Sequence, residues 1–203
     1  PAHSYRFWMI GGYSSALCRK FGIEVVCAWG MTETITQGII SSFHQPPPEG
    51  SIGRAAPCYV IEVRDDDGNV VGPGGQGVLH VRGVPGVSLF KEYFDDPEAT
   101  RAAVTADGWL RTGDMISIDA DGYLYFLGRD KDMLKVGAEN VAASEIESVI
   151  MASGLVEECA VVGRRHYMLD EVPVAFVIPK EGVAAAIEHE LIAHCRRNLA
   201  ISR

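Results

Sequence analysis

Three short segments of this 203-residue chain carry side chains that could bind a nucleotide. Thr32-Glu33-Thr34 combines hydroxyls, which can donate to a phosphate oxygen, with a carboxylate of the kind that binds Mg²⁺ beside phosphates. Asp114 could accept hydrogen bonds from both hydroxyls of a ribose, and Arg129 could reach the same ribose and a phosphate. Each segment alone also fits an ordinary structural role: a helix N-terminus, a turn aspartate or a surface ion pair.

The N-terminal part of the chain has the pattern of a layered α/β edge. Residues 5–10 form an apolar, aromatic run that predicts a buried strand. A short helix capped by Ser14 or Ser15 is expected next, followed by a second buried strand over 24–28. A strand, a helix and a strand in succession predict a parallel crossover, so residues 1–45 are expected to be the edge of a parallel α/β layer.

After Gln45-Pro46-Pro47-Pro48 the pattern changes to short strands separated by turn residues. The expected strands cover 59–64, 77–82, 115–119 and 122–127, with hairpin-like turns at 66–69 and 119–122. Such a succession predicts an antiparallel, barrel-like β lobe over residues 46–130.

Beyond this lobe the pattern predicts a small α+β domain, residues 131–203, with its boundary at Asp130–Lys131. Its expected elements are a helix over 143–152, strands over 159–162 and 172–178, and a helix over 183–198. Ser144 and Glu147 have the spacing of a capping box. The predicted fold class is therefore α/β plus α+β.

Composition and charge exclude several classes of protein. Hydrophobic residues make up 47% and charged residues 22%, as in ordinary globular proteins. The formal charge of −9 argues against a nucleic-acid binder, which needs a basic surface. No apolar run reaches the thickness of a bilayer, so no membrane span is expected. The five cysteines are dispersed without a CxxC pair, which predicts reduced thiols and a cytoplasmic location.

Two further motifs do not have the context that their chemistry needs. Residues 72–77 spell GxGxxG, but an alternating strand follows them where a dinucleotide site needs a helix, so we interpret them as a turn. His189 and His194 lie five residues apart rather than four, which places them on different faces of a helix. We interpret both as surface histidines.

The order of three segments resembles the second half of adenylate-forming enzymes, the superfamily of acyl-CoA synthetases, aryl-CoA ligases and luciferases. They are Trp29-Gly30-Met31-Thr32-Glu33-Thr34, Arg111-Thr112-Gly113-Asp114 and Gly128-Arg129-Asp130-Lys131-Asp132. Within this superfamily, residues 31–35 and 86–94 look most like crotonobetaine/carnitine–CoA ligases and related acyl-CoA synthetases. The resemblance implies that ATP activates a carboxylic acid to an acyl-AMP, which then passes its acyl group to the thiol of CoA.

The resemblance also implies roles for individual residues in the end of a large nucleotide-binding domain, residues 1–130. Thr32 and Glu33 would be catalytic, with Glu33 as the Mg²⁺ ligand. Trp29 stands where the family has tyrosine and would stack on adenine, and Tyr13 replaces the family's usual alanine. The implied nucleotide-binding residues for ATP or AMP are Gly11, Gly12, Tyr13, Trp29, Gly30, Met31, Thr32, Asp114, Phe126 and Arg129.

Residues 131–203 resemble the mobile C-terminal domain of the family. Lys131 would be the hinge on which this domain turns between the two half-reactions. The resemblance assigns the thioester step with CoA to Lys135, Gly137, Ala138, Glu139 and Asn140.

Two parts of the family pattern do not occur in residues 1–203: the phosphate loop with its lysine, and the C-terminal lysine segment. We therefore expect an inactive fragment of an acyl-CoA synthetase, which self-associates, for example as a homodimer, to cover exposed apolar strand surface. The alternatives are an adenylation domain that loads a carrier protein and a non-catalytic protein that reuses the half-domain. The substrates that the resemblance implies are a small carboxylic acid and CoA.

Overall fold

A computed structural model describes residues 3–136, 139–183 and 187–199. The chain divides into two compact units, Pro1–Phe126 and Leu127–Arg203. This division lies four residues before the boundary expected from the sequence. Within the described residues, no helix has the length and apolar character needed to cross a membrane.

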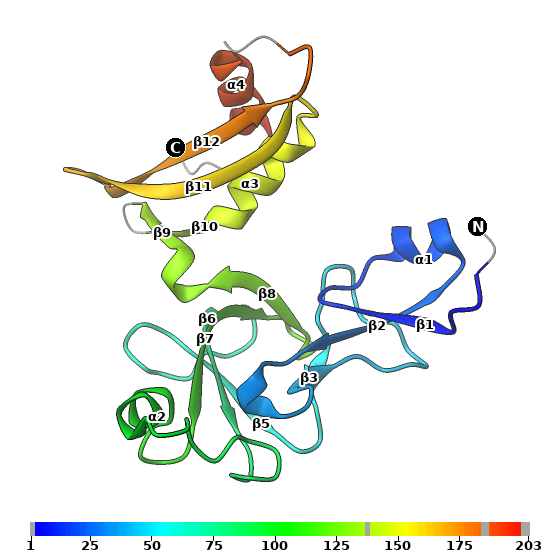
Figure 1. Ribbon diagram of the computed structural model, residues 1–203, viewed down its shortest axis with the longest axis vertical. Helices are drawn as coiled ribbons and strands as arrows, with labels where there is room; N and C mark the ends of the chain where they lie inside the picture. The colour runs from blue at the N-terminus through cyan, green and yellow to red at the C-terminus, as the bar shows by residue number, and fades with distance from the viewer. Residues whose placement is uncertain (1–2, 137–138, 184–186, 200–203) are drawn as a thin grey trace. The chain divides into compact units, whose positions relative to one another are not determined.

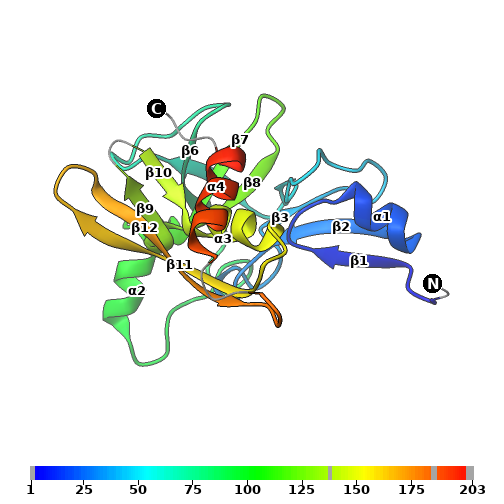
Figure 2. The same cartoon turned by 90° about the horizontal axis from the view of Figure 1, so that it is seen from above.

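The first sheet of the N-terminal unit has the order β1-β2-β3-β4 and contains the expected parallel crossover. Its elements are β1 (Phe7–Ile10), α1 (Ser15–Phe21), β2 (Glu24–Trp29), β3 (Ile39–Ile40) and β4 (Arg54–Ala55). Figures 1 and 2 show α1 beside the pair of parallel strands β1 and β2. The Ser14 hydroxyl accepts from the Leu17 amide at 3.4 Å, which confirms Ser14 as the helix cap.

The prediction that the first strand is buried is wrong. Trp8 packs against Phe21 of α1, with ring centroids 5.0 Å apart. Side chains alternate along a strand, so Phe7 and Met9 lie on the face away from α1, where they are 41% and 50% exposed. Helix α1 covers only one face of β1, and periodicity alone could not reveal this.

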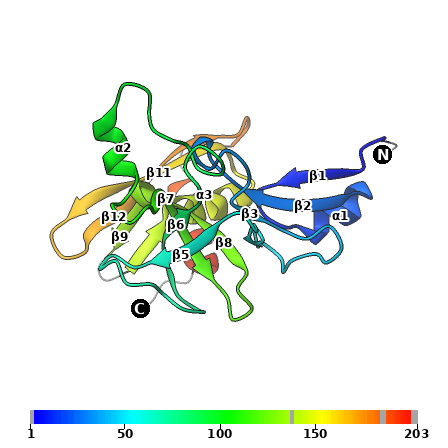
Figure 3. The ribbon, with the colours of Figure 1, turned by 90° about the horizontal axis from the view of Figure 1, so that it is seen from below.

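The second sheet of this unit is antiparallel, with the order β5-β6-β7-β8. Its strands are β5 (Val60–Arg64), β6 (Gln76–Arg82), β7 (Leu110–Ile118) and β8 (Leu124–Arg129), and the short helix α2 (Pro97–Ala103) contacts β7. Figure 3 shows β5, β6 and β7 side by side. The order of the described strands does not return from β8 to β5, so the sheet is open and the expected barrel does not close.

Strand β7 contains an irregularity that places Asp114 in its interior. Met115 pairs with Val78 and Arg111 pairs with His80, so three residues of β7, including Asp114, lie opposite the single residue Leu79. Gly113 has a φ of +73° at this point, a conformation that favours glycine. The sequence predicted a strand that begins only at residue 115, which is wrong because β7 already begins at Leu110 and the turn-like pair Thr112-Gly113 is an irregularity inside it.

The second unit is built on the sheet β10-β9-β12-β11. Its elements are η2 (Asp130–Asp132), β9 (Met133–Val136), β10 (Glu139–Ala142), α3 (Ala143–Ala152), β11 (Val156–His166), β12 (Asp170–Pro179) and α4 (Glu188–Asn198). Helices α3 and α4 are in contact and lie side by side in Figure 2. Their residues Ile146, Ile150 and Leu191 pack with Val156 and Val161 of β11 in one apolar core.

Helix α3 has the expected bounds, but three other predictions for this unit need correction. The capping box is wrong: Ala142 is the N-cap without a side-chain bond, while the Ser144 hydroxyl donates to the Leu127 carbonyl at 3.5 Å and Glu147 accepts from the Val161 amide at 2.8 Å. Helix α4 begins at Glu188 rather than at residue 183. Strands β9 and β10, over residues 133–136 and 139–142, were not among the expected elements of this unit.

Candidate functional site

Residues 32–34 form a single 3-10 turn, η1 (Thr32–Thr34), directly after β2. The Thr34 side chain is fully buried and holds this turn: its Oγ1 accepts from the Met31 amide at 3.0 Å and donates to a nearby carbonyl, that of Met31 or Thr36. The Tyr59 hydroxyl contacts the Thr34 carbonyl from another side. Thr32 is exposed and Glu33 is half-buried. Both predicted catalytic residues therefore lie on a turn that the buried Thr34 side chain and the Tyr59 hydroxyl hold in place.

Gly30 and Met31 connect this turn to β2. A Cβ at Gly30 would lie 2.8 Å from Gln37 Oε1 and 3.0 Å from the Thr36 carbonyl, so a larger residue would displace the segment that follows η1. Met31 has extended backbone, with a φ of −138°, and precedes the turn as its N-cap. The glycine at this position therefore serves close backbone packing, whether or not a nucleotide binds here.

Glu33 is held by both its backbone and its side chain. The Tyr93 hydroxyl donates to Glu33 Oε1 at 2.6 Å, and the Phe90 amide donates to the Glu33 carbonyl at 2.7 Å. The hydrogen bond to Glu33, together with burial, raises the pKa of Tyr93 to about 12. The phenol therefore remains a proton donor at neutral pH.

Asp114 and Trp29 are joined by a buried hydrogen bond. The Trp29 indole donates through Nε1 to Asp114 Oδ2 at 2.7 Å, and the two residues are 9% and 2% exposed. The Thr112 hydroxyl accepts from the Asp114 amide at 3.1 Å and donates to the Leu79 carbonyl at 3.0 Å, which fixes the backbone of the bulge. Two predicted nucleotide-binding residues from different sheets thus meet directly, and the predicted stacking of Trp29 on adenine stays a prediction.

The turn Gly11-Gly12-Tyr13 is tied to Gly50 and Ser51, and Ser51 in turn contacts the start of strand β8. The Tyr13 amide donates to the Ser51 carbonyl at 2.9 Å, and the Gly50 amide donates to the Tyr13 carbonyl at 2.8 Å. A Cβ at Gly12 would lie 3.2 Å from the Gly50 carbonyl oxygen, so this close approach favours glycine. The Ser51 hydroxyl in turn donates to the carbonyl of Leu124, two residues before the exposed Phe126.

The remaining predicted residues belong to the second unit. Arg129, at the end of β8, and Lys131, in η2, are both exposed. The Lys135 amide donates to Glu171 Oε2 at 2.9 Å. Glu139 and Asn140 lie in β10, while Gly137 and Ala138 lie outside the described residues.

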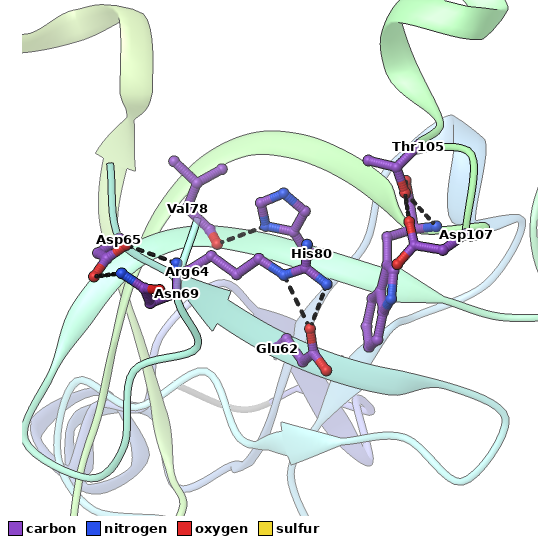
Figure 4. Close-up of polar contacts among 9 residues, drawn as sticks. Glu62, Arg64, Asp65, Asn69, Val78, His80, Thr105 and Asp107 are labelled. Carbon is purple, nitrogen blue, oxygen red and sulfur yellow. Dashed lines mark hydrogen bonds and ion pairs between the residues drawn. The ribbon is translucent and has the colours of Figure 1, made fainter. Parts of the chain in front are cut away.

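A further polar cluster lies on the face of the β5-β6-β7 sheet opposite the buried Leu79. Figure 4 shows Arg64 bound to Glu62, with Nη2 and Oε2 at 2.6 Å, and His80 Nδ1 at 3.0 Å from the Val78 carbonyl. Burial lowers the pKa of His80, and the positive charges of Arg64 and Arg111 lower it further. Sequence reasoning gave this cluster no functional role.

Two family models and many curated proteins match this chain. The family model described as AMP-binding enzyme matches residues 12–94, and the model of the AMP-binding enzyme C-terminal domain matches residues 145–201. The crotonobetaine/carnitine–CoA ligases of Escherichia fergusonii and Escherichia coli O8 are 41% and 40% identical to this chain over 188 residues. Each alignment covers 91% of this chain and 36% of the relative.

The chain belongs to the adenylate-forming, AMP-binding enzyme family. Among solved structures, it resembles O-succinylbenzoate CoA synthetase from Bacillus subtilis. The structure of that enzyme in complex with its acyl-adenylate intermediate matches this chain with a TM-score of 0.78 and 33% sequence identity, and the match covers 91% of this chain and 37% of the enzyme. With ATP and a magnesium ion, it gives 0.77 at 31% identity, covering 95% and 40%. The chain thus spans little more than a third of the length of these curated relatives.

In this member of the adenylate-forming family, sequence reasoning missed the groups that hold the predicted site. Tyr93 was named only within a segment of family likeness, and Tyr59 only as the first residue of a strand. Their separation from η1 along the chain, 60 residues between Tyr93 and Glu33, hides both contacts from any local pattern. The available signal in the sequence was a tyrosine that follows Lys91-Glu92 in a segment between Gly86 and Pro97. Such a signal does not identify the residue that the tyrosine contacts.

Proposed function

We propose that this chain is the C-terminal part of an ATP-dependent acid–thiol ligase, an AMP-forming acyl-CoA synthetase. The observation that supports it best is the pair of anchored carboxylates, Glu33 and Asp114, in the unit that contains the match to the AMP-binding enzyme model. In the complete enzyme, the carboxylate of the substrate acid attacks the α-phosphorus of ATP and displaces pyrophosphate. The thiol of CoA then attacks the acyl-AMP and releases AMP.

Each predicted residue has a chemical task in this scheme. Thr32, exposed on η1, donates its hydroxyl to the α-phosphate. Asp114 accepts hydrogen bonds from the ribose hydroxyls, which orients the nucleotide. Tyr13, Trp29 and Phe126 are proposed to enclose the adenine, and Arg129 to bind the ribose and a phosphate.

Magnesium fits the residues present. The described residues contain no group of three or more His, Cys, Asp or Glu side chains that could cage a metal. Mg²⁺ bound with a nucleotide usually needs only one or two protein carboxylates, because phosphates and waters complete its shell. Glu33 would hold the ion, which offsets the charge that develops on the phosphates.

The second unit would serve the thioester step. We propose that Lys131 is the hinge of the mobile domain and that residues 135–140 guide the CoA thiol. We further propose that the isolated chain is inactive, because the family's two lysine-bearing segments do not occur in residues 1–203. These roles rest on the resemblance and on the family match of residues 145–201.

The test is pyrophosphate exchange with ATP in the complete protein, over a panel of acids that includes crotonobetaine and carnitine. Acid-dependent exchange followed by acyl-CoA formation is the expected result. Exchange without transfer to CoA would favour a carrier-protein-loading domain, and absence of exchange with every acid would favour a non-catalytic protein. The isolated chain serves as the comparison and should give no exchange.

A further inference from the structure

Residues 83–94, which we name the 83–94 loop, reach Glu33 from a distant part of the chain. Two of the loop's residues bind the same glutamate: Phe90 through its amide and Tyr93 through its hydroxyl. The two contacts hold different ends of Glu33, the carbonyl at 2.7 Å and the side-chain oxygen Oε1 at 2.6 Å. A loop that only needed to cover η1 would not require a bond to the carboxylate.

The loop is itself well braced, so it can act as a support. The Val84 carbonyl lies within hydrogen-bond distance of the Ser88 and Leu89 amides, at 2.9 and 3.1 Å. Ser88 and Leu89 are 7% and 3% exposed. The Tyr59 hydroxyl, which contacts η1, also lies 2.8 Å from the Ser88 carbonyl. The 83–94 loop and η1 therefore share an anchor besides Glu33.

Tyr93 is also fixed independently of its hydroxyl. Its ring packs against Phe90, with centroids 4.8 Å apart, and its amide donates to Thr100 Oγ1 at 2.9 Å. Loss of the hydroxyl alone would leave these contacts in place. The phenol oxygen can thus be separated experimentally from the structural role of the ring.

The chemistry of the contact suits the control of a metal ligand. A neutral phenol that donates to a carboxylate forms a short, charge-assisted hydrogen bond. A glutamate side chain otherwise samples several rotamers, and restriction of its motion before a ligand arrives lowers the entropy lost on binding. With Oε1 engaged by Tyr93, Oε2 remains as the oxygen for a cation.

We propose that Tyr93 is a positioning residue for Glu33: its hydroxyl orients the carboxylate that binds the divalent cation accompanying ATP. This inference rests on the proposed function, because it takes Glu33 as the metal ligand. Partners that orient metal ligands typically contribute 10–100-fold to metal affinity. Tyr93→Phe is therefore expected to weaken cation binding about tenfold while the fold is retained.

The experiment uses the complete protein and Mn²⁺ as the probe. Free Mn²⁺ is measured by electron paramagnetic resonance during titration of the protein with saturating ATP and no acid substrate. Tyr125→Phe is the matched control, because Tyr125 likewise donates to a carboxylate, Asp119 Oδ2 at 2.9 Å, in a hairpin turn. We expect weaker Mn²⁺ binding in Tyr93→Phe, wild-type affinity in Tyr125→Phe, and unchanged metal-free AMP binding by calorimetry in both.

A double-mutant cycle with Glu33→Gln shows whether Tyr93 acts through Glu33. On that background Tyr93→Phe should have no further effect on Mn²⁺ affinity, and a full additional loss would overturn the inference. Wild-type Mn²⁺ affinity in the single variant Tyr93→Phe would also overturn it and leave the proposed function standing. Failure of the wild-type protein to bind Mn²⁺ with ATP would overturn both.

A second pair of variants tests the same inference if Tyr93→Phe does not fold. Tyr93→Gln keeps a hydrogen-bond donor on a long side chain, and Tyr93→Met has a similar length without a donor. Tyr93→Gln is expected to bind Mn²⁺ more tightly than Tyr93→Met. Equal affinities, or the reverse order, would refute the positioning role.

Discussion

The bond between Trp29 and Asp114 gives a quantitative test of how the first unit holds its buried carboxylate. Trp29→Phe keeps an aromatic ring in the core but removes the indole donor that lies 2.7 Å from Asp114 Oδ2. Both residues are more than nine-tenths buried, so water cannot readily replace this donor. A hydrogen bond to a charged group contributes roughly 1.5–3 kcal/mol. The smaller ring buries less apolar surface, which adds about 1 kcal/mol.

The expected loss for Trp29→Phe is therefore about 2.5–4 kcal/mol in the free energy of unfolding. The matched control is Trp109→Phe. Trp109 is 3% exposed, and the guanidinium groups of Arg64 and Arg82 lie over its ring, 5.2 and 4.7 Å from the ring centroid. The donor to Asp114 is Trp29, so Trp109→Phe leaves that hydrogen bond intact. That change removes similar ring area and weakens two cation–π contacts of roughly 0.5–1 kcal/mol each. Because phenylalanine keeps part of each contact, we expect a smaller loss, about 1–3 kcal/mol.

The decisive measurement is a double-mutant cycle. The free energy of unfolding of each variant is measured by urea unfolding, monitored by far-ultraviolet circular dichroism. Asp114→Asn removes the charge and keeps a similar shape, so Trp29→Phe should cost at least about 1 kcal/mol less on that background than in the wild-type chain. Additivity within about 0.5 kcal/mol would refute the reasoning. The contact would then contribute packing only, and Asp114 would not depend on the indole donor.

Three further predictions concern the site and its surroundings. Asp114→Ala in the complete protein should weaken ATP binding about tenfold or more, since the ribose hydroxyls lose a charged acceptor; unchanged affinity by calorimetry would remove Asp114 from the site. Lys131→Pro fixes φ near −65° and should damage CoA transfer far more than pyrophosphate exchange, whereas equal loss in both half-reactions would contradict a hinge. The folded-state pKa of His80 is lowered, so its neutral form stabilises the fold above about pH 6.5, and this stability is lost as pH falls through the folded-state pKa. Between pH 7.5 and 5, the free energy of unfolding in urea should fall further for the wild-type chain than for the His80→Asn variant. Parallel pH profiles for the two proteins would contradict this.

Local patterns predicted those elements whose chemistry is local. Helix α3 has the bounds expected from its periodicity, and the turn at 66–69 closes because the Gly68 amide donates to the Asp65 carbonyl at 3.0 Å. The GxGxxG segment forms a turn at residues 73–74, and its last two residues begin β6, as the strand pattern after the glycines indicated. In each case the deciding residues lie within a few positions of one another. Such signals survive without knowledge of the tertiary fold.

The incorrect predictions share a different cause. Exposure of β1 depends on which face α1 covers, and the N-cap of α3 depends on Glu147 and Ser144 binding other segments. The open sheet β5-β6-β7-β8 likewise depends on whether its two edge strands meet. None of these facts is encoded within a window of ten residues. They are set by contacts between distant segments, which a pattern cannot enumerate.

The candidate site depends both on local sequence signals and on contacts between distant segments. For this reason its carboxylates could be predicted from the sequence, whereas the side chains that donate hydrogen bonds to them could not. Family resemblance identified Glu33 and Asp114 one at a time. Their donors lie 60 and 85 residues away along the chain, and each donor is an aromatic side chain that sequence reasoning assigned to other tasks or to none. An aromatic donor combines a rigid ring, fixed by packing, with one directed N–H or O–H. It can therefore orient a carboxylate without adding a charge that would compete with the ligand. In the proposed enzyme this arrangement leaves the negative charges of Glu33 and Asp114 available to the cation and the ribose.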